Sequence, residues 1–131
     1  MKAYLKNIIS GATLSLALLP HPLPTWAGTR VVAEVFVGQN VAKGAVASAR
    51  FSSDNQQYIG CTTVNQHGSR AAACYARDKN GAIFSCDTTD PNLVVVADAI
   101  TDYSYVSFSA PAGSNTTCNS VYIGNSSVYL P

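Results

Sequence analysis

The chain has 131 residues, of which 47% are hydrophobic and only 11% are charged, and its formal net charge is +1. This length predicts one domain and excludes large enzyme folds such as the α/β barrel, which needs roughly 200 residues or more. The small number of lysines and arginines argues against nucleic acid as a partner, because nucleic-acid binding depends on many cationic contacts with phosphates.

The first 27 residues have the three parts of a secretory signal peptide. Lys2 and Lys6 give a positive start, a largely apolar run covers residues 8–19, and small residues precede an expected cleavage after Ala27. The apolar run is shorter than the roughly 20 residues that a membrane-spanning helix requires. The alternatives, an uncleaved anchor or a buried N-terminal helix, are disfavoured by three prolines within residues 20–24.

We therefore expect a signal peptide over residues 1–27, a β-rich domain over residues 28–131, and a secreted or periplasmic location. No other stretch of the sequence is apolar enough for a membrane span. Residues 28–131 carry six basic and seven acidic side chains, so the low charge belongs to the domain itself and is not produced by the leader. The solvent-exposed surface of this domain must therefore consist largely of neutral polar side chains.

Short runs rich in Val, Tyr, Phe, Thr and Ala alternate with turn residues in this domain, a spacing typical of many short β-strands. Two turns are marked by His67-Gly68 and by Lys79-Asn80-Gly81, since tight hairpins require positive φ angles that Gly and Asn tolerate. Residues 39–43, between two glycines, are expected to form a connecting loop. We expect strands at residues 30–37, 46–51, 57–64, 70–77, 82–86, 104–110, 117–123 and 128–130.

Residues 91–100 are predicted to form a short helix. Asp90 can cap its start and Pro91 suits the first helical position. Leu93, Val96, Ala97 and Ile100 have the spacing of one helix face. Three consecutive valines also fit a buried strand, which is the alternative. The fold class is therefore all-β with one short helix, as a small disulfide-stapled β-sandwich or, alternatively, a small β-barrel.

Four cysteines in an exported chain predict two disulfides. A two-residue His67-Gly68 loop places Cys61 opposite Cys74 at a non-hydrogen-bonded pair, where side chains approach closely. A three-residue loop at residues 79–81 would place Cys74 opposite Cys86 at a hydrogen-bonded pair, whereas a two-residue loop would misalign them. This count favours Cys61–Cys74 with Cys86–Cys118. The runner-up is Cys74–Cys86 with Cys61–Cys118.

The domain offers few residues for catalysis. His67, its only histidine, sits in a predicted turn, and Glu34, the only glutamate, is expected on a solvent-facing side of its strand. Asp87 and Asp90 form the one close acidic pair, which we interpret as a turn and a helix cap in preference to a calcium or acid–base site. We predict no catalytic residue, no metal site and no cofactor. Asn115 and Asn125 lie in glycosylation sequons.

Tyrosines are the most suggestive surface feature. Strand alternation places Tyr58, Tyr103, Tyr105 and Tyr122 on the side of their strands away from the aliphatic side chains. If the aliphatic side is core, the four tyrosines could form one outward stripe. Tyrosine combines apolar area with a polar tip and is favoured at protein contacts. The alternative is that these tyrosines only pair across strands.

The expected function is a non-catalytic binding or interaction module for a protein or a glycan. One alternative is a structural subunit of an extracellular assembly, built by β-strand addition through residues 29–38 or 126–131. A small secreted hydrolase is the weaker alternative, because it would have to rely on aspartates.

Overall fold

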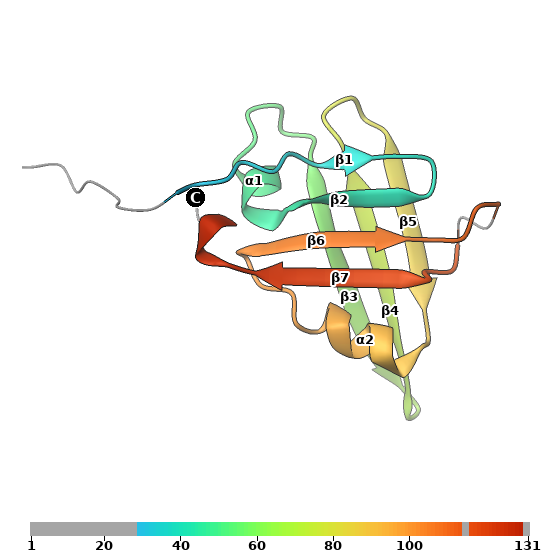
Figure 1. Cartoon of the computed structure of the whole chain (residues 1–131). Helices are drawn as coiled ribbons and strands as arrows, with labels where there is room; N and C mark the ends of the chain where they lie inside the picture. Colours follow the sequence, from blue (N-terminus) through green and yellow to red (C-terminus); the bar gives the residue numbers. More distant parts are fainter. Residues whose placement is uncertain (1–28, 114–115, 130–131) are drawn as a thin grey trace, which may run out of the picture.

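A computed structural model describes residues 29–113 and 116–129. The expected signal peptide and the sequon residue Asn115 lie outside the described residues. The fold consists of two antiparallel sheets that pack face to face, with their strands crossing (Figure 1). The sheets do not close into a barrel, so the predicted disulfide-stapled β-sandwich is confirmed and the barrel alternative is wrong.

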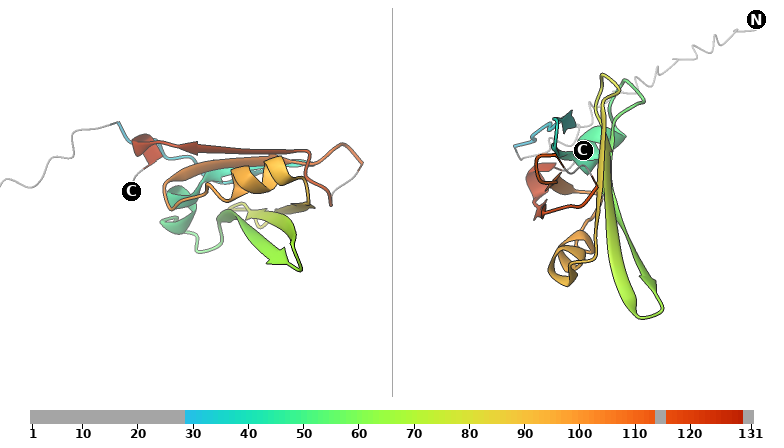
Figure 2. Two further views of the ribbon diagram at one scale, coloured as in Figure 1. Left: turned by 90° about the horizontal axis from the view of Figure 1, so that it is seen from below. Right: turned by 90° about the vertical axis from the view of Figure 1, so that its right-hand side faces the viewer.

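The four-stranded sheet has the order β1-β2-β6-β7 and the three-stranded sheet the order β3-β4-β5. The first consists of β1 (Phe36–Val37), β2 (Val41–Ala45), β6 (Ser104–Ser109) and β7 (Ser120–Asn125). The second consists of β3 (Tyr58–Gln66), β4 (Ser69–Arg77) and β5 (Ile83–Thr88). The helices are α1 (Val46–Arg50), α2 (Pro91–Ala97) and a 3₁₀ helix (Ser127–Tyr129). Helix α2 and the four-stranded sheet lie on the same side of the three-stranded sheet (Figure 2).

The core lies between the two sheets and is built largely from small residues. In β4 every second side chain points inward, and Ala72, Cys74 and Ala76 are fully or almost fully buried. Phe84 of β5 stacks on Phe108 of β6 with ring centroids 5.6 Å apart, which joins the two sheets. Alternation of buried and exposed positions along a strand is expected where one face of a sheet is core and the other is wet.

The N-terminal part of the domain differs from the prediction. Residues 46–51 are not a strand, because α1 occupies Val46–Arg50, and the expected loop at residues 39–43 contains most of β2. The small residues of β2 allow the chain before β1 to pack against it: a Cβ on Gly44 would lie 2.9 Å from Val35 Cα. A strand of Ala and Gly carries no hydrophobic alternation, which is why the pattern missed it.

Only the last two residues of the predicted strand 30–37 pair as β1. The chain before them is held by single contacts. The Ala45 N–H donates to the Ala33 carbonyl at 2.9 Å, and the Val35 N–H donates to the Gln57 side chain at 2.8 Å. Val35 is buried and Glu34 is exposed, which is the orientation expected for this segment. The Glu34 carboxylate forms an ion pair with Lys79 at 2.7 Å.

The predicted strand at residues 128–130 is also not formed by its described residues, because Val128 and Tyr129 belong to the 3₁₀ helix. Ser126 starts a 3₁₀ turn, since its hydroxyl accepts from Val128 N–H at 3.4 Å and its carbonyl accepts from Tyr129 N–H at 3.2 Å. Local bonds of this kind compete with strand pairing. The Val128 carbonyl instead accepts from Val31 N–H at 2.8 Å, so the two segments considered for strand addition contact each other within the chain.

The local signals of helix and turns are confirmed. Helix α2 begins after Asp90, whose carboxylate accepts from Asn92 N–H at 2.8 Å, and residues 98–100 continue only as turns. His67 and Gly68 have φ angles of 52° and 82°, as a two-residue hairpin loop requires. Gly81, with a φ of 86°, closes a three-residue loop after β4, in which Asp78 N–H donates to the Ala82 carbonyl at 3.0 Å.

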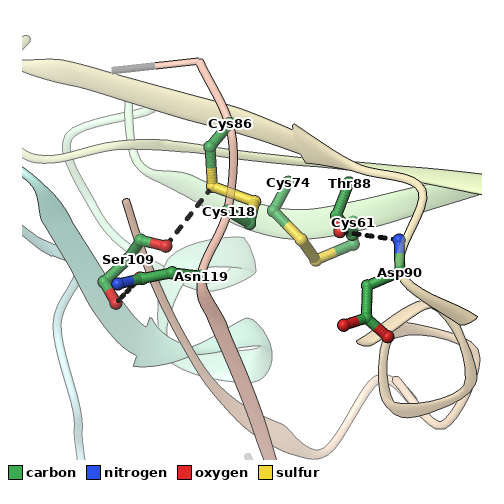
Figure 3. The surroundings of a disulfide bond; sticks show 8 residues. All are labelled: Cys61, Cys74, Cys86, Thr88, Asp90, Ser109, Cys118 and Asn119. Carbon is green, nitrogen blue, oxygen red and sulfur yellow. Dashed lines mark hydrogen bonds between the residues drawn. A yellow bond between two sulfur atoms is a disulfide. The ribbon is translucent and has the colours of Figure 1, made fainter. Parts of the chain in front are cut away.

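Two disulfides staple the fold. Cys61 is bonded to Cys74 between β3 and β4, and Cys86 is bonded to Cys118 across a sequence separation of 32, as the favoured count expects (Figure 3). The second bond ties β5 to the segment before β7, where Asp87 N–H also donates to the Thr116 carbonyl at 2.8 Å. Two disulfides of this kind fit an oxidising compartment.

Candidate binding surface

The outer side of the four-stranded sheet carries a group of aromatic side chains that we call the aromatic face. Along β6, Ser104, Val106 and Phe108 are buried, so Tyr105 and Ser107 point outward. The same alternation buries Val121 of β7 and exposes Tyr122. The aromatic face consists of Phe36, Lys43, Tyr105, Ser107, Tyr122 and Tyr129.

Four of these residues form a row across the sheet. Phe36 is the register partner of Lys43, Lys43 of Ser107, and Ser107 of Tyr122. Phe36 and Tyr122, at the two ends of the row, are 52% and 59% exposed. The Lys43 ammonium lies 5.5 Å from the centroid of the Phe36 ring, a cation–π distance. The row therefore presents an aromatic ring, a cation, a hydroxyl and a second aromatic ring in succession.

Three tyrosines gather at the β7 end of the face. Tyr105 stacks on Tyr129 of the 3₁₀ helix, with ring centroids 5.5 Å apart and an interplanar angle of 28°. Burial raises the pKa of Tyr105, and the neighbouring Tyr129 and Tyr122 phenols add to the shift. Gly124 is the register partner of Tyr105, and a Cβ there would lie 3.3 Å from the Tyr122 ring. This glycine leaves room for the ring to lie along the sheet.

The structure does not bring the four predicted tyrosines into one stripe. Tyr105 and Tyr122 share the aromatic face, whereas Tyr58 lies on the outer face of the three-stranded sheet. There it meets Tyr75 edge to face, with centroids 6.0 Å apart. Tyr103 precedes β6 in a turn and lines a shallow hollow with Arg50, Phe51 and Asp102. The four tyrosines therefore do not form one stripe, because Tyr58 belongs to the other sheet and Tyr103 lies in a turn.

Four members of the aromatic face were not predicted as site residues: Phe36, Lys43, Ser107 and Tyr129. Strand alternation puts Phe36 on the same outward side as Glu34, but nothing in the sequence relates it to Tyr122. Lys43 fell in an expected loop, and Tyr129 fell in an expected strand. The missing information is the pairing order β1-β2-β6-β7, which joins residues far apart in the sequence.

The residues considered for catalysis have roles in the fold. His67 occupies the exposed β3–β4 turn and Asp90 caps α2. The backbone of Asp87 forms an isolated β-bridge with Thr117. Among residues 29–113 and 116–129, no three His, Cys, Asp or Glu side chains are grouped so that they could hold a metal ion. The Asn125 side chain is engaged with Ser104 and with the Ala99 carbonyl, which gives this sequon asparagine a structural role.

Within the described part of the chain, no helix has both the length and the apolar character needed to cross a membrane. Comparison with protein families, with curated proteins and with solved structures finds no match for the chain.

Proposed function

We propose that this protein is an exported, non-catalytic binding module that binds a glycan on its aromatic face. Export rests on the leader-like residues 1–27 and accords with the two disulfides. The observation that carries the proposal is the cluster of Tyr105, Tyr122 and Tyr129 on one side of one sheet, beside an outward serine.

Glycans suit this surface for chemical reasons. The C–H faces of pyranose rings pack on aromatic rings, while their hydroxyl groups form hydrogen bonds with neutral polar groups. Tyrosine offers both an apolar ring and a hydroxyl. Beside the tyrosines, Ser107, Ser109 and Ser120 occupy outward register positions of β6 and β7. A sheet face of this kind is open along its length, which accommodates a chain-like ligand.

A glycan microarray tests the proposal with a matched pair of variants. Tyr122→Ala removes an exposed tyrosine from the aromatic face, whereas Tyr58→Ala removes an exposed tyrosine from the opposite sheet. We expect Tyr122→Ala to weaken binding about tenfold or more, as is usual for an aromatic anchor, and Tyr58→Ala to leave it unchanged. Equal binding by both variants, with unchanged thermal unfolding, would contradict the assignment of the surface. Absence of any glycan binding by the wild-type protein would contradict the glycan.

A further inference from the structure

Lys43 is the cation of the aromatic face, and it lacks the acidic partner that three of the other basic residues have. Lys79 is paired with Glu34, Arg70 with Asp98, and Arg50 with Asp102. Among the residues that the structure describes, Lys43 has no carboxylate within 4.0 Å. It contacts the Phe36 ring instead.

The outward register positions around Lys43 contain no acidic residue. Beyond the aromatic face itself, they are Val41, Ser109, Ser120 and Gly124, whereas Ala45 on the same strand as Lys43 is fully buried. On β2, β6 and β7 the face therefore carries one positive charge and no negative charge, although residues 28–131 as a whole have one more acid than base. Glu34, two residues before Phe36, is already paired with Lys79. An occupant that complements this surface carries a negative charge at one place and is otherwise neutral.

The row across the sheet fixes where that charge would lie. Neighbouring strands are about 4.8 Å apart, so Lys43 on β2 and Tyr122 on β7 are separated by two strand spacings, roughly 10 Å. Ser107 lies between them, and no hydrogen bond of its side chain is found within the described residues. A sugar ring packed on Tyr122 can therefore extend past the Ser107 hydroxyl toward the Lys43 ammonium.

We propose that the aromatic face selects glycans that contain a carboxylated sugar, a uronic acid, with the carboxylate at Lys43. A single flexible lysine acts as a point charge and suits one carboxylate. A densely sulfated chain would instead call for a cluster of cations, which this face lacks. This inference rests on the proposed function, since it names the ligand class of the same surface.

The test compares each acid with its own uncharged derivative. Tetrasaccharides of galacturonic, glucuronic and mannuronic acid are titrated beside their methyl esters, which keep the same rings and remove only the charge. We expect the wild-type protein to bind at least one acid about fivefold more tightly than its ester at low salt. Lys43→Gln should remove this difference, so that the variant binds each acid no more tightly than it binds the corresponding ester. Lys79→Gln removes an equal charge outside the face and should preserve the difference.

The outcomes separate this inference from the proposed function. Equal binding of acid and ester, or a preference that survives in Lys43→Gln, would overturn the assignment of the carboxylate to Lys43 and leave glycan binding intact. If the wild-type protein binds neutral glycans but none of the acids or esters, the uronic acid is wrong and the glycan module stands. A protein that binds no glycan at all, and binds a protein ligand through Tyr122, would overturn both.

Discussion

Cys74 and Cys86 lie directly opposite each other on β4 and β5, yet each is bonded to a different cysteine. Cys74 is also the register partner of Cys61 on β3, so three cysteines share one row of the three-stranded sheet. Its bonded partner is 4.0 Å away between Cα atoms, the close approach of a non-hydrogen-bonded pair. Counting from the Asp78–Ala82 loop places Cys74 and Cys86 at the wider, hydrogen-bonded pair.

This row predicts unequal consequences for the two halves of one disulfide. In Cys118→Ser, the free Cys86 thiolate can attack Cys74 Sγ, which forms Cys74–Cys86 and releases the Cys61 thiolate. In Cys86→Ser the free thiol is that of Cys118, which is not part of this row and has no register partner among its cysteines. We expect peptide mapping after alkylation to find Cys61 labelled in Cys118→Ser but not in Cys86→Ser. If Cys61 were equally unlabelled in both variants, with only the freed partner cysteine alkylated, the predicted exchange along this row would be contradicted.

Loss of the Cys86–Cys118 bond should also reduce stability. The closed loop is longer than that of Cys61–Cys74, with sequence separations of 32 and 13. In the chain-entropy account the corresponding losses are about 4 and about 3 kcal/mol. The free energy of unfolding of Cys86→Ser, measured by denaturant unfolding, should therefore be about 4 kcal/mol lower than that of the wild-type protein. A midpoint close to that of the wild-type protein would argue against a structural role for the bond.

Two glycines on different sheets test how the N-terminal segment packs. A Cβ on Gly44 would lie 2.9 Å from Val35 Cα and 3.2 Å from the Glu34 carbonyl oxygen, both parts of the backbone. Gly44→Ala should therefore destabilise the fold by about 1–3 kcal/mol, as overpacking does. A Cβ on Gly60 would meet nothing within 4 Å, so Gly60→Ala is the control and should be neutral or stabilising by about 0.5–1 kcal/mol. Thermal unfolding of both variants measures the difference, and equal effects would contradict the packing.

Asp54 predicts an acid-dependent weakening of the same region. The Gln57 side chain and the Gln56 backbone N–H donate to this carboxylate and lower its pKa from 3.8 to about 2. Gln57 also accepts from Val35 N–H, so the Asp54 loop supports the N-terminal segment. Because the pKa is lower in the folded state, its stabilisation is present above about pH 4 and is lost as the pH falls toward 2.

The variant Asp54→Asn lacks this ionisation and isolates its contribution. We expect the wild-type melting temperature to exceed that of the variant near pH 6, and the gap to shrink between pH 4 and pH 2. Melting curves measured by circular dichroism across this range provide the comparison. A gap that stays constant down to pH 2 would show that ionisation of Asp54 does not support the fold.

The parts of the fold that were predictable depend on nearby residues. The His67-Gly68 loop fixes the β3–β4 register, and that register places Cys61 opposite Cys74 over a short stretch of chain. Asp90 and Pro91 start α2 by local capping alone. In these places the hydrogen-bond partners lie within a few residues of each other, so the local sequence is sufficient to predict the structure.

The parts that were missed depend on contacts between distant residues. The small residues of β2 become a strand because the segment ending at Val35 packs against them, and no periodicity of large side chains announces it. Strand alternation predicts that the Tyr105 and Tyr122 side chains point outward. It cannot predict that the strand of Tyr58 belongs to the other sheet. The stack of Tyr129 on Tyr105 requires the 3₁₀ turn at Ser126, which an expected strand obscured.

The most direct test of the aromatic face is an NMR titration of the uniformly ¹⁵N-labelled protein with the glycan that binds best on the microarray. We predict that the largest amide shift changes fall on β2, β6 and β7, centred on Lys43, Ser107 and Tyr122. The amides around Tyr58 and Tyr75 on the opposite sheet should remain unchanged. Shift changes centred on Tyr58 and Tyr75, with none at Lys43, Ser107 and Tyr122, would contradict the account.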